Sequence, residues 1–256
     1  MGYRHWGFVL VVAVALCGAV RVVADEAEDR AVAAVEKLGG RVLRDETKPG
    51  NPVVKVGLYQ TGVTDAGLRE LAPLTNLTSL FLNRTKVTGV GLKDLTSLKK
   101  LTELNLAGSE TTDAGLKELA PFTNLTTLYI DNTKVTDIGL KALAPLKRLT
   151  KLSLQDSQVT DAGLQNLAPL KGLTSLDLKK TKLSDAGLKE LAPLKRLTSL
   201  DLSHTAVTDA GLKELAPLKE LTELFLTETK ITGTGLKELA PLQRLTSLYL
   251  NDPGSC

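Results

Sequence analysis

The chain from Thr181 to His204 reads TKLSDAGLKELAPLKRLTSLDLSH, and this pattern of 24 residues occurs eight times between residues 61 and 252 without insertion or deletion. Eight positions keep their character from repeat to repeat, with Thr111 as the one polar exception among the apolar ones. In repeat 1 these positions are Val63, Gly67, Leu68, Leu71, Leu74, Leu77, Leu80 and Leu82. A fixed period of this length predicts a solenoid of stacked repeats.

The end of each repeat has the periodicity of a strand. In repeat 1 the leucines stand at positions 77, 80 and 82, and at the end of this stretch every second residue is a leucine that would point inward. Alternation over so short a stretch predicts a strand that turns one face toward a core.

The segment that follows has the spacing of a short helix. In Thr160 to Ala168, Leu164 and Leu167 are three residues apart, which puts them on one helical face. Thr160 or Asp161 is expected to cap the first free N–H groups, and Asp161 also suits the positive end of the helix dipole. Pro169 is expected to end the helix, because the residue before a proline avoids the α conformation.

One repeat has too little apolar surface to fold alone, so neighbouring repeats must stack. Parallel strands need a crossover connection, and the short helix supplies it. The sequence therefore predicts an α/β fold, a right-handed solenoid with a parallel concave sheet and short helices on the convex side. Repeats of two helices are excluded because they need about 34 residues. The glycine series that begins at Gly67 is expected to allow close approach of helix and sheet.

The pattern L-x-x-L-x-L-x-x-[T/S]-x-[V/I/L]-T-D-A-G-L resembles the leucine-rich repeat family over about three quarters of the chain. It is most similar to the 24-residue variety of exported bacterial proteins, planctomycete ones especially. Where that family usually has an inward asparagine, the chain has a hydroxyl residue, which is expected to bond the loop backbone instead. These residues are Thr85, Ser109, Thr133, Ser157, Thr181, Thr205 and Thr229. The resemblance implies a protein-binding function.

Residues 1–24 have the features of a signal peptide. Arg4 precedes an apolar run from Trp6 to Val20, and acidic residues begin at Asp25. Cleavage after Ala24 is the expected processing, which predicts a secreted, periplasmic or cell-envelope location. An uncleaved membrane anchor is the alternative, but a spanning helix needs about 20 apolar residues, more than this run contains. Membrane contact is expected only through such an uncleaved leader.

Residues 25–60 are expected to form an N-terminal cap. It would contain a helix up to residue 38 that ends at Gly39 and Gly40, a short strand at 42–43, a turn at 49–50 and a strand at 53–58. The last of these strands is in phase with the repeats, which gives nine strands in phase. Residues 253–256 form a tail without a comparable cap, so the sheet is expected to end in an open edge.

Composition argues against several functions. The net charge is +3, or +1 without the leader arginines Arg4 and Arg21, which is too little for a nucleic-acid-binding protein. The two cysteines, Cys17 and Cys256, lie in the leader and at the last position, so no internal disulfide is expected in the processed chain.

Catalysis, metal binding and cofactors are not expected either. His204 is the only histidine beyond the leader, so no cluster of several histidines and cysteines can hold a metal. Asp201, Ser203 and His204 lie close together along one strand end, where three residues rarely reach the geometry of a catalytic triad. We therefore expect a protein that is not an enzyme.

Five aromatic residues occupy outward strand positions, which alternation assigns to the concave face of the sheet. They are Tyr59, Phe81, Tyr129, Phe225 and Tyr249, whereas Phe122 takes a core position. Exposed aromatics are typical of binding hot spots. We expect them to form one cluster toward each end of the sheet and to bind a protein partner. The alternative is cross-strand packing by residues that favour strands.

Charged residues lie between these aromatics. Asp177 and Asp201 occupy the same position in successive repeats, about 4.8 Å apart on neighbouring parallel strands. Two such carboxylates can share a proton or a cation, but neutralisation by Lys179 and Lys180 is the expected arrangement. Together with Asp131, these aspartates and lysines would orient a protein partner by charge.

The function expected is a protein-binding module that acts outside the cytoplasm. One alternative is a structural or self-associating envelope component that pairs through its C-terminal edge. A ubiquitin-ligase-type substrate adaptor is less favoured, since residues 25–52 are too few for the helical adaptor domain.

Overall fold

The computed structural model describes residues 26–250 of the chain. The leader, the tail 253–256 and the last two residues of repeat 8 lie outside this range, so the cleavage site remains a prediction. Among the described residues, no helix has the length and apolar character needed to cross a membrane.

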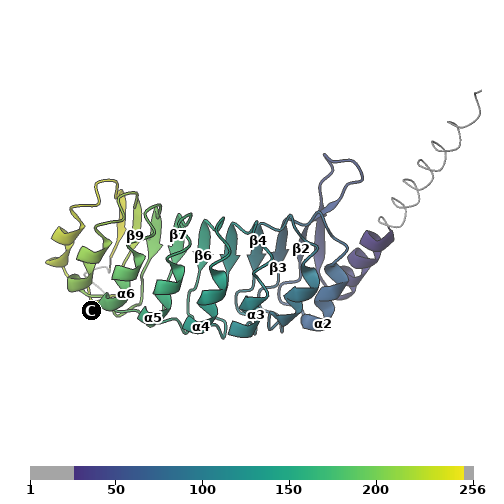
Figure 1. The fold of residues 1–256 in the computed structure, drawn as a ribbon, viewed down its shortest axis with the longest axis horizontal. Coiled ribbons are helices and arrows are strands. Elements are labelled where there is room, and N and C mark those ends of the chain that lie inside the picture. Colours follow the sequence, from purple (N-terminus) through teal and green to yellow (C-terminus); the bar gives the residue numbers. More distant parts are fainter. Residues whose placement is uncertain (1–25, 251–256) are drawn as a thin grey trace, which may run out of the picture.

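The strands form one sheet in chain order, seen as a row in Figure 1. They are β1 (Arg41–Arg44), β2 (Val53–Gly57), β3 (Ser79–Phe81), β4 (Glu103–Asn105), β5 (Thr127–Tyr129), β6 (Lys151–Ser153), β7 (Ser175–Asp177), β8 (Ser199–Asp201), β9 (Glu223–Phe225) and β10 (Ser247–Tyr249). The strands β2 to β10 are parallel, and each residue pairs with its equivalent in the next repeat, as predicted. Strand β1 is antiparallel to β2, and the loop between them projects beyond the row of strands (Figure 1).

Short helical segments lie on the other side of the solenoid from the strands (Figure 1). Every repeat contains such a segment, α or 3₁₀, and residues 26–37 form the longer helix of the N-terminal cap. The repeat segments are α2 (Asp65–Leu68), η1 (Arg69–Leu71), η2 (Val90–Leu95), α3 (Asp113–Lys117), α4 (Asp137–Leu140), η3 (Lys141–Leu143), α5 (Asp161–Leu164), η4 (Gln165–Leu167), α6 (Asp185–Leu188), η5 (Lys189–Leu191), η6 (Asp209–Leu215) and η7 (Gly235–Leu239). The solenoid with a parallel concave sheet and convex helices is confirmed.

Much of this helical structure is 3₁₀ rather than α. Repeats 2, 7 and 8 have only a 3₁₀ segment, and four others end in one. A 3₁₀ helix has three residues per turn, so residues three apart lie one above the other. The spacing of Leu164 and Leu167 fits this geometry, and both side chains are fully buried.

The predicted role of proline was wrong in its mechanism. Ala168, directly before Pro169, keeps helical dihedral angles of φ −51° and ψ −31°. The proline does not force its neighbour into extended conformation, and repeat 2, which lacks the proline, ends its helical segment at the equivalent leucine, Leu95. In repeat 2, where Ser97 replaces the proline, the Ser97 hydroxyl donates to the Ala72 carbonyl of repeat 1 at 2.7 Å.

The core is a continuous stack of leucines between the sheet and the helical segments. The inward leucines of the central repeats are about 0–1% exposed, and Phe122 is also buried, as predicted. The polar exception, Thr111, is fully buried, and its hydroxyl pairs with that of Ser109 at 2.7 Å. Each buried leucine removes enough apolar surface from water to stabilise the fold by about 1.5–3 kcal/mol.

The hydroxyl residues at the usual asparagine position bond the loop backbone, as predicted. Thr85 donates to the Leu82 carbonyl at 2.6 Å, and Thr181 and Thr205 make the same bond within their own repeats. Ser157 is the exception, because its buried hydroxyl has no protein partner. Each bond closes the turn after a strand without reaching the next repeat.

A second set of threonines joins one repeat to the next just before the strands. Thr102 donates through its backbone N–H and its hydroxyl to the Thr78 carbonyl, at 2.9 and 3.1 Å. Equivalent hydroxyl bonds occur in every repeat, from Thr78 to Thr246. They tie the repeats together along the side where the chain enters the sheet.

The convex side has its own bonds between repeats, made by the aspartate of the TDAGL motif. Asp161 accepts from the Ser184 N–H at 2.9 Å and from the Ser184 hydroxyl at 2.5 Å in the next repeat. The same Ser184 oxygen accepts from the Ala186 N–H at 3.3 Å and caps helix α6. Of the two predicted caps, the hydroxyl residue is therefore the cap, while the aspartate bonds the following repeat.

The glycine of the motif is explained by this aspartate. A Cβ added at Gly187 would overlap the Asp161 carboxylate, and Gly139, Gly163, Gly211 and Gly235 stand against the aspartates of their preceding repeats in the same way. The expectation that this glycine allows close approach of helix and sheet was wrong, since the close contact is with the preceding repeat.

We expect Gly187→Ala to lower the free energy of unfolding by about 1–3 kcal/mol, the usual cost of overpacking. The new methyl group would displace the Asp161 carboxylate from Ser184. Urea unfolding of the variant and the wild-type protein measures this difference.

Gly67→Ala is the matched control in repeat 1, which has no preceding repeat. Its Cβ would meet only Val63 at 3.1 Å and Leu38 at 3.9 Å, and alanine favours a helix more than glycine does. It should be close to neutral. If the two substitutions destabilise the protein equally, contact with the preceding aspartate is not the reason why this position is a glycine.

Candidate functional site

The concave face consists of three rows of side chains that run across the strands. The first row, at the first position of β3 to β10, contains Ser79, Glu103, Thr127, Lys151, Ser175, Ser199, Glu223 and Ser247, preceded by Lys55 in β2. The second row contains Gly57, Phe81, Asn105, Tyr129, Ser153, Asp177, Asp201, Phe225 and Tyr249. The third row, two residues further on, begins with Tyr59 and includes Asp131 and Lys179. Every site residue predicted from the sequence lies in the second or third row.

The aromatic cluster predicted at the C-terminal end is a stacked pair. The rings of Phe225 and Tyr249, on neighbouring strands β9 and β10, have centroids 4.3 Å apart and an interplanar angle of 1°. Tyr249 remains 46% exposed. Offset or parallel stacking holds such rings in fixed orientations, so the pair forms a rigid apolar surface.

The predicted N-terminal cluster is looser. Tyr59 is 48% exposed and lies over Gly57, where an added Cβ would come within 3.2 Å of the tyrosine ring. Phe81 is half-buried on the adjacent strand. Its ring does not stack with that of Tyr59, because the one ring–ring contact within residues 26–250 is that between Phe225 and Tyr249. Glycine at position 57 is thus what lets Tyr59 lie against the sheet.

Tyr129 belongs to neither end. It lies on β5, separated from Phe81 by β4, and the Lys151 ammonium is 5.2 Å from its ring centroid. This is the distance of a cation–π contact. The expectation of two end clusters therefore holds at the C-terminal end only, with Tyr129 paired to a lysine in the middle of the face.

Sequence reasoning missed Leu43, which is 54% exposed on β1. Leu43 pairs with Lys55 of β2, whereas its neighbour Val42 pairs with the buried Val56. Leu43 therefore faces the same side as the first row and extends the apolar N-terminal end of the concave face. Only the antiparallel register of the hairpin reveals this, because position 43 lies outside the repeat.

The carboxylates of Asp177 and Asp201 lie directly opposite each other on β7 and β8, as the repeat register predicts. Each accepts a hydrogen bond from a backbone N–H two residues on, Lys179 at 2.9 Å and Ser203 at 2.8 Å. Burial raises the pKa of Asp177, and the charges of Asp201 and Asp131 act in the same direction, although the Lys179 N–H bond opposes them.

Neutralisation of this pair by lysine side chains, which the sequence suggested, is wrong. In the part of the chain that the structure describes, no ion pair joins a lysine to Asp177 or Asp201. Lys179 contributes its backbone N–H, and Lys180 has a left-handed φ of 56° in the turn. Asp177 and Asp201 therefore face the hollow without an ion pair to a lysine side chain among residues 26–250.

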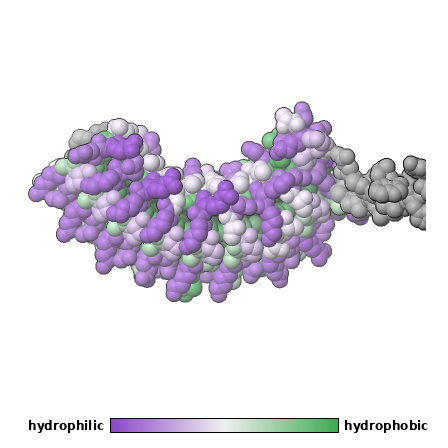
Figure 2. Space-filling model, turned by 45° about the horizontal axis from the view of Figure 1, so that its top comes forward, coloured by the Kyte–Doolittle hydropathy of each residue, from purple (hydrophilic) through white to green (hydrophobic). Residues whose placement is uncertain are grey.

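These residues surround a shallow hollow of about 220 Å³ on the sheet. Its floor is made by Ser153, Ser175 and Ser199, whose small side chains leave space above the strands. Its sides are formed by Tyr129 with Lys151 at one end, and by Asp177, Asp201 and Phe225 at the other. The space-filling view shows the molecule hollowed between its two ends, with hydrophilic residues predominating (Figure 2).

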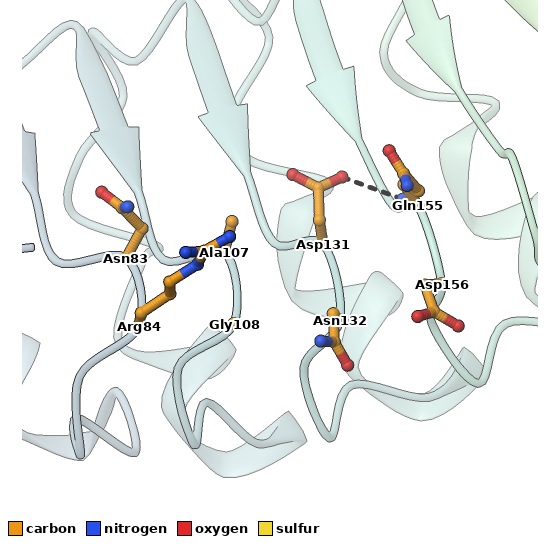
Figure 3. A pocket seen from close by; sticks show the side chains of 8 residues that line it. All are labelled: Asn83, Arg84, Ala107, Gly108, Asp131, Asn132, Gln155 and Asp156. Carbon is orange, nitrogen blue, oxygen red and sulfur yellow. Dashed lines mark hydrogen bonds between the residues drawn. The ribbon is translucent and has the colours of Figure 1, made fainter. Parts of the chain in front are cut away.

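A second depression of about 340 Å³ lies along the turns that follow β3 to β6 (Figure 3). Asp131 points into it and accepts from the Gln155 N–H at 2.9 Å, the bond drawn in Figure 3. Arg84, Asn132 and Asp156 each have a positive φ there, and Gly108 takes the same conformation without a side chain. A Cβ at Gly108 would come within 3.2 Å of the Arg84 side chain, so this glycine makes room for the arginine.

The residues that suggested a hydrolase do not form a catalytic arrangement. The Ser203 N–H donates to Asp201, and His204 stands exposed in the turn with a φ of 57°. Within residues 26–250, no group of three His, Cys, Asp or Glu side chains is arranged to hold a metal ion.

Comparisons with known proteins agree with this description. The fold and its repeats define a leucine-rich repeat solenoid, and models of the leucine-rich repeat family match residues 97–120, 123–144 and 147–207. The chain is a leucine-rich repeat protein. No curated protein sequence matches it.

Two solved structures of Listeria monocytogenes internalins have the same fold. Internalin C2 is 28% identical with a TM-score of 0.63, and the match covers 86% of this chain and 92% of that one. The internalin InlF is 19% identical with a TM-score of 0.53, over 89% and 90% of the two chains, and shows the fold alone. A leucine-rich repeat domain of this kind suits a protein-binding repeat module.

Asp177→Asn should raise the free energy of unfolding at pH 7. Because burial raises the pKa of Asp177, the stability that its protonated form contributes is present below the ordinary pKa of about 3.9 and is lost as pH rises through the raised pKa. Asparagine stays neutral and still accepts from Lys179, as Asn105 accepts from the Ala107 N–H in the same row.

Urea unfolding at pH 7 and at pH 3.5 tests this. The advantage of the variant should be present at pH 7 and should shrink at the lower pH. A variant that is less stable than wild type at pH 7, or equally changed at both pH values, would contradict the assignment of a disfavoured charge.

Proposed function

We propose that this leucine-rich repeat protein is a non-enzymatic binding module that acts outside the cytoplasm and holds a protein partner on its concave face. The stacked pair of Phe225 and Tyr249 is the observation that supports it most strongly. A rigid, partly exposed aromatic pair on an open sheet face is typical of a binding hot spot, because the rings lose little freedom when a partner covers them.

The distribution of polarity along the face supports a partner that is long enough to reach both ends. Leu43, Tyr59 and Phe81 place apolar side chains at the N-terminal end, beside Lys55, and the stacked pair places them at the C-terminal end. Between them, hydroxyl and carboxylate side chains leave the hollow of about 220 Å³. Apolar anchors at the ends would supply affinity, and the charged middle would supply orientation.

The proposed location rests on the leader sequence. The basic Arg4, the apolar run from Trp6 to Val20 and the small residue Ala24 suit export and cleavage. The partner is therefore to be sought in the culture medium or the cell-envelope fraction.

Phe225→Ala and Tyr249→Ala should each weaken binding to the captured partner by at least about 2 kcal/mol, roughly thirtyfold in Kd. Truncation of either ring removes its own contact and leaves the other ring without its stacking neighbour. Titration calorimetry with the purified partner measures the affinity, and circular dichroism reports the fold.

Lys189→Ala is the control on the convex side, where the lysine is exposed, and it should change neither affinity nor stability. If the aromatic substitutions unfold the protein while affinity per folded molecule is unchanged, the rings are packing residues and the concave face is not the binding surface.

Self-association is a second candidate function, favoured by the exposed leucines of the last repeat. Leu248 and Leu250 are 36% and 37% exposed, whereas the equivalent Leu224 and Leu226 of the preceding repeat are 0% and 1% exposed. At the other end of the sheet, β1 and the helix of residues 26–37 cover repeat 1. A second copy would therefore pair edge to edge through β10.

Light scattering over a range of concentrations should then show a monomer–dimer equilibrium, which Leu248→Lys shifts fully to monomer. The charged side chain would stand where a second copy buries its own leucine. A wild-type protein that is monomeric at every concentration would exclude this candidate and leave the binding proposal unaffected.

A further inference from the structure

The open face of the Phe225 ring carries an inference about the partner's chemistry. The ring planes of Phe225 and Tyr249 are parallel, and their centroid separation of 4.3 Å is close to the spacing of about 4.8 Å between strands. The stack therefore runs along the sheet from β10 to β9. Tyr249 covers one face of Phe225, and the other face is turned toward β8.

The residue next to that face is Asp201, which pairs directly with Phe225 in the register of β8 and β9. Asp177 follows on β7, and Glu223 stands in the first row beside Ser199. The carboxylates of Asp201 and Asp177 thus lie on the side of that ring face, together with the serine side chains that line the hollow. We call this end of the hollow, bounded by Phe225, Asp201 and Asp177, the acidic slot.

The cations nearest to the acidic slot do not fill it. Lys151 lines the far end of the hollow and is held over the Tyr129 ring, 5.2 Å from its centroid. Lys179 uses its backbone N–H to bond Asp177, and within residues 26–250 neither lysine forms an ion pair with a carboxylate of the slot. Lys151 also repels a cation from the Tyr129 end, which favours the Phe225 end.

We infer that the acidic slot binds an arginine side chain of the protein partner, a conclusion that rests on the proposed function. A guanidinium group is planar, so it stacks on the open face of Phe225 while its N–H groups reach the carboxylates beside the ring. A lysine ammonium has the charge without the plane and uses only part of this arrangement. Arginine is also among the residues that most often dominate binding energy.

Charge complementarity supports the same occupant. The carboxylate of Asp177 is held where burial and the neighbouring charges of Asp201 and Asp131 disfavour ionisation. A cation placed between Asp177 and Asp201 relieves that repulsion. Part of the favourable free energy of binding therefore comes from removing the electrostatic repulsion between carboxylates in the free protein.

The probe is the capped tripeptide acetyl-Gly-Arg-Gly-amide, titrated into the isotope-labelled full chain and followed by NMR. The backbone N–H signals of Lys179 and Ser203 are the reporters, because these groups bond the Asp177 and Asp201 carboxylates directly. The arginine peptide should shift both signals with saturation. The peptides with lysine or glutamate in the middle should bind at least about threefold more weakly or not at all.

Two variants locate the effect, and a third on the same face is their control. Asp201→Asn should weaken binding of the arginine peptide about tenfold, and Phe225→Leu about threefold. Glu103→Gln removes a first-row carboxylate on β4, away from the slot, and should leave binding unchanged. Asparagine fits at position 201, since Asn105 occupies the same row with the same turn bond.

Equal shifts from the arginine and lysine peptides, or binding unaffected by Asp201→Asn, would overturn the inference. The proposed function has a separate outcome. If Phe225→Ala abolishes partner binding while the arginine peptide gives no shift, the concave face binds a protein by other chemistry. If neither partner binding nor peptide binding depends on these residues, the proposed function fails with the inference.

Discussion

The whole structure depends on one constraint, that a single repeat cannot bury its own leucines. A short strand and one or two turns of helix leave most of their apolar surface uncovered unless another repeat lies on each side. Stacking solves this, and the leucines of the central repeats become almost completely inaccessible to water. Because every repeat has the same length, stacking also brings each strand residue beside its equivalent in the next repeat.

This register turns single polar residues into series of bonds between repeats. The Thr102 hydroxyl reaches Thr78, and the Asp161 carboxylate reaches Ser184, each one repeat away. Repeat 2 shows what happens when a member is missing. Gly89 stands at the aspartate position there, and the next repeat bonds instead through its Thr112 N–H to the Thr88 carbonyl at 3.1 Å. The stack continues, but a neutral carbonyl replaces the carboxylate.

The side chains of the core and of the convex side therefore make the contacts that hold the repeats together, whereas most of those of the concave face do not. Its outward side chains do not pack in the leucine core, so they are free to differ from repeat to repeat without loss of the fold. They do differ, from Phe81 through Asn105 and Asp177 to Tyr249 in a single row. Variation in one row beside strict repetition elsewhere is what a surface adapted to a particular partner requires.

The sequence by itself determined the number of repeats, the strands in phase and the residues of the leucine core. Alternation and a fixed period are local properties, and stacking only multiplies them, so these predictions needed no coordinates. The concave position of Tyr59, Phe81, Tyr129, Phe225 and Tyr249 also followed from alternation. The facing of Asp177 and Asp201 followed from the fixed period of the repeats.

Only the tertiary structure decided which atoms meet across the repeats. It showed that the motif glycine stands against the preceding aspartate, that Asp177 is bound by a backbone N–H and not by a lysine side chain, and that Leu43 lies on the concave face. It also separated Tyr129, paired with Lys151, from the stack of Phe225 and Tyr249. The physical reason is that period and alternation fix which face a side chain occupies. Its partner on that face depends on rotamers, on the hairpin register and on distances of a few ångströms.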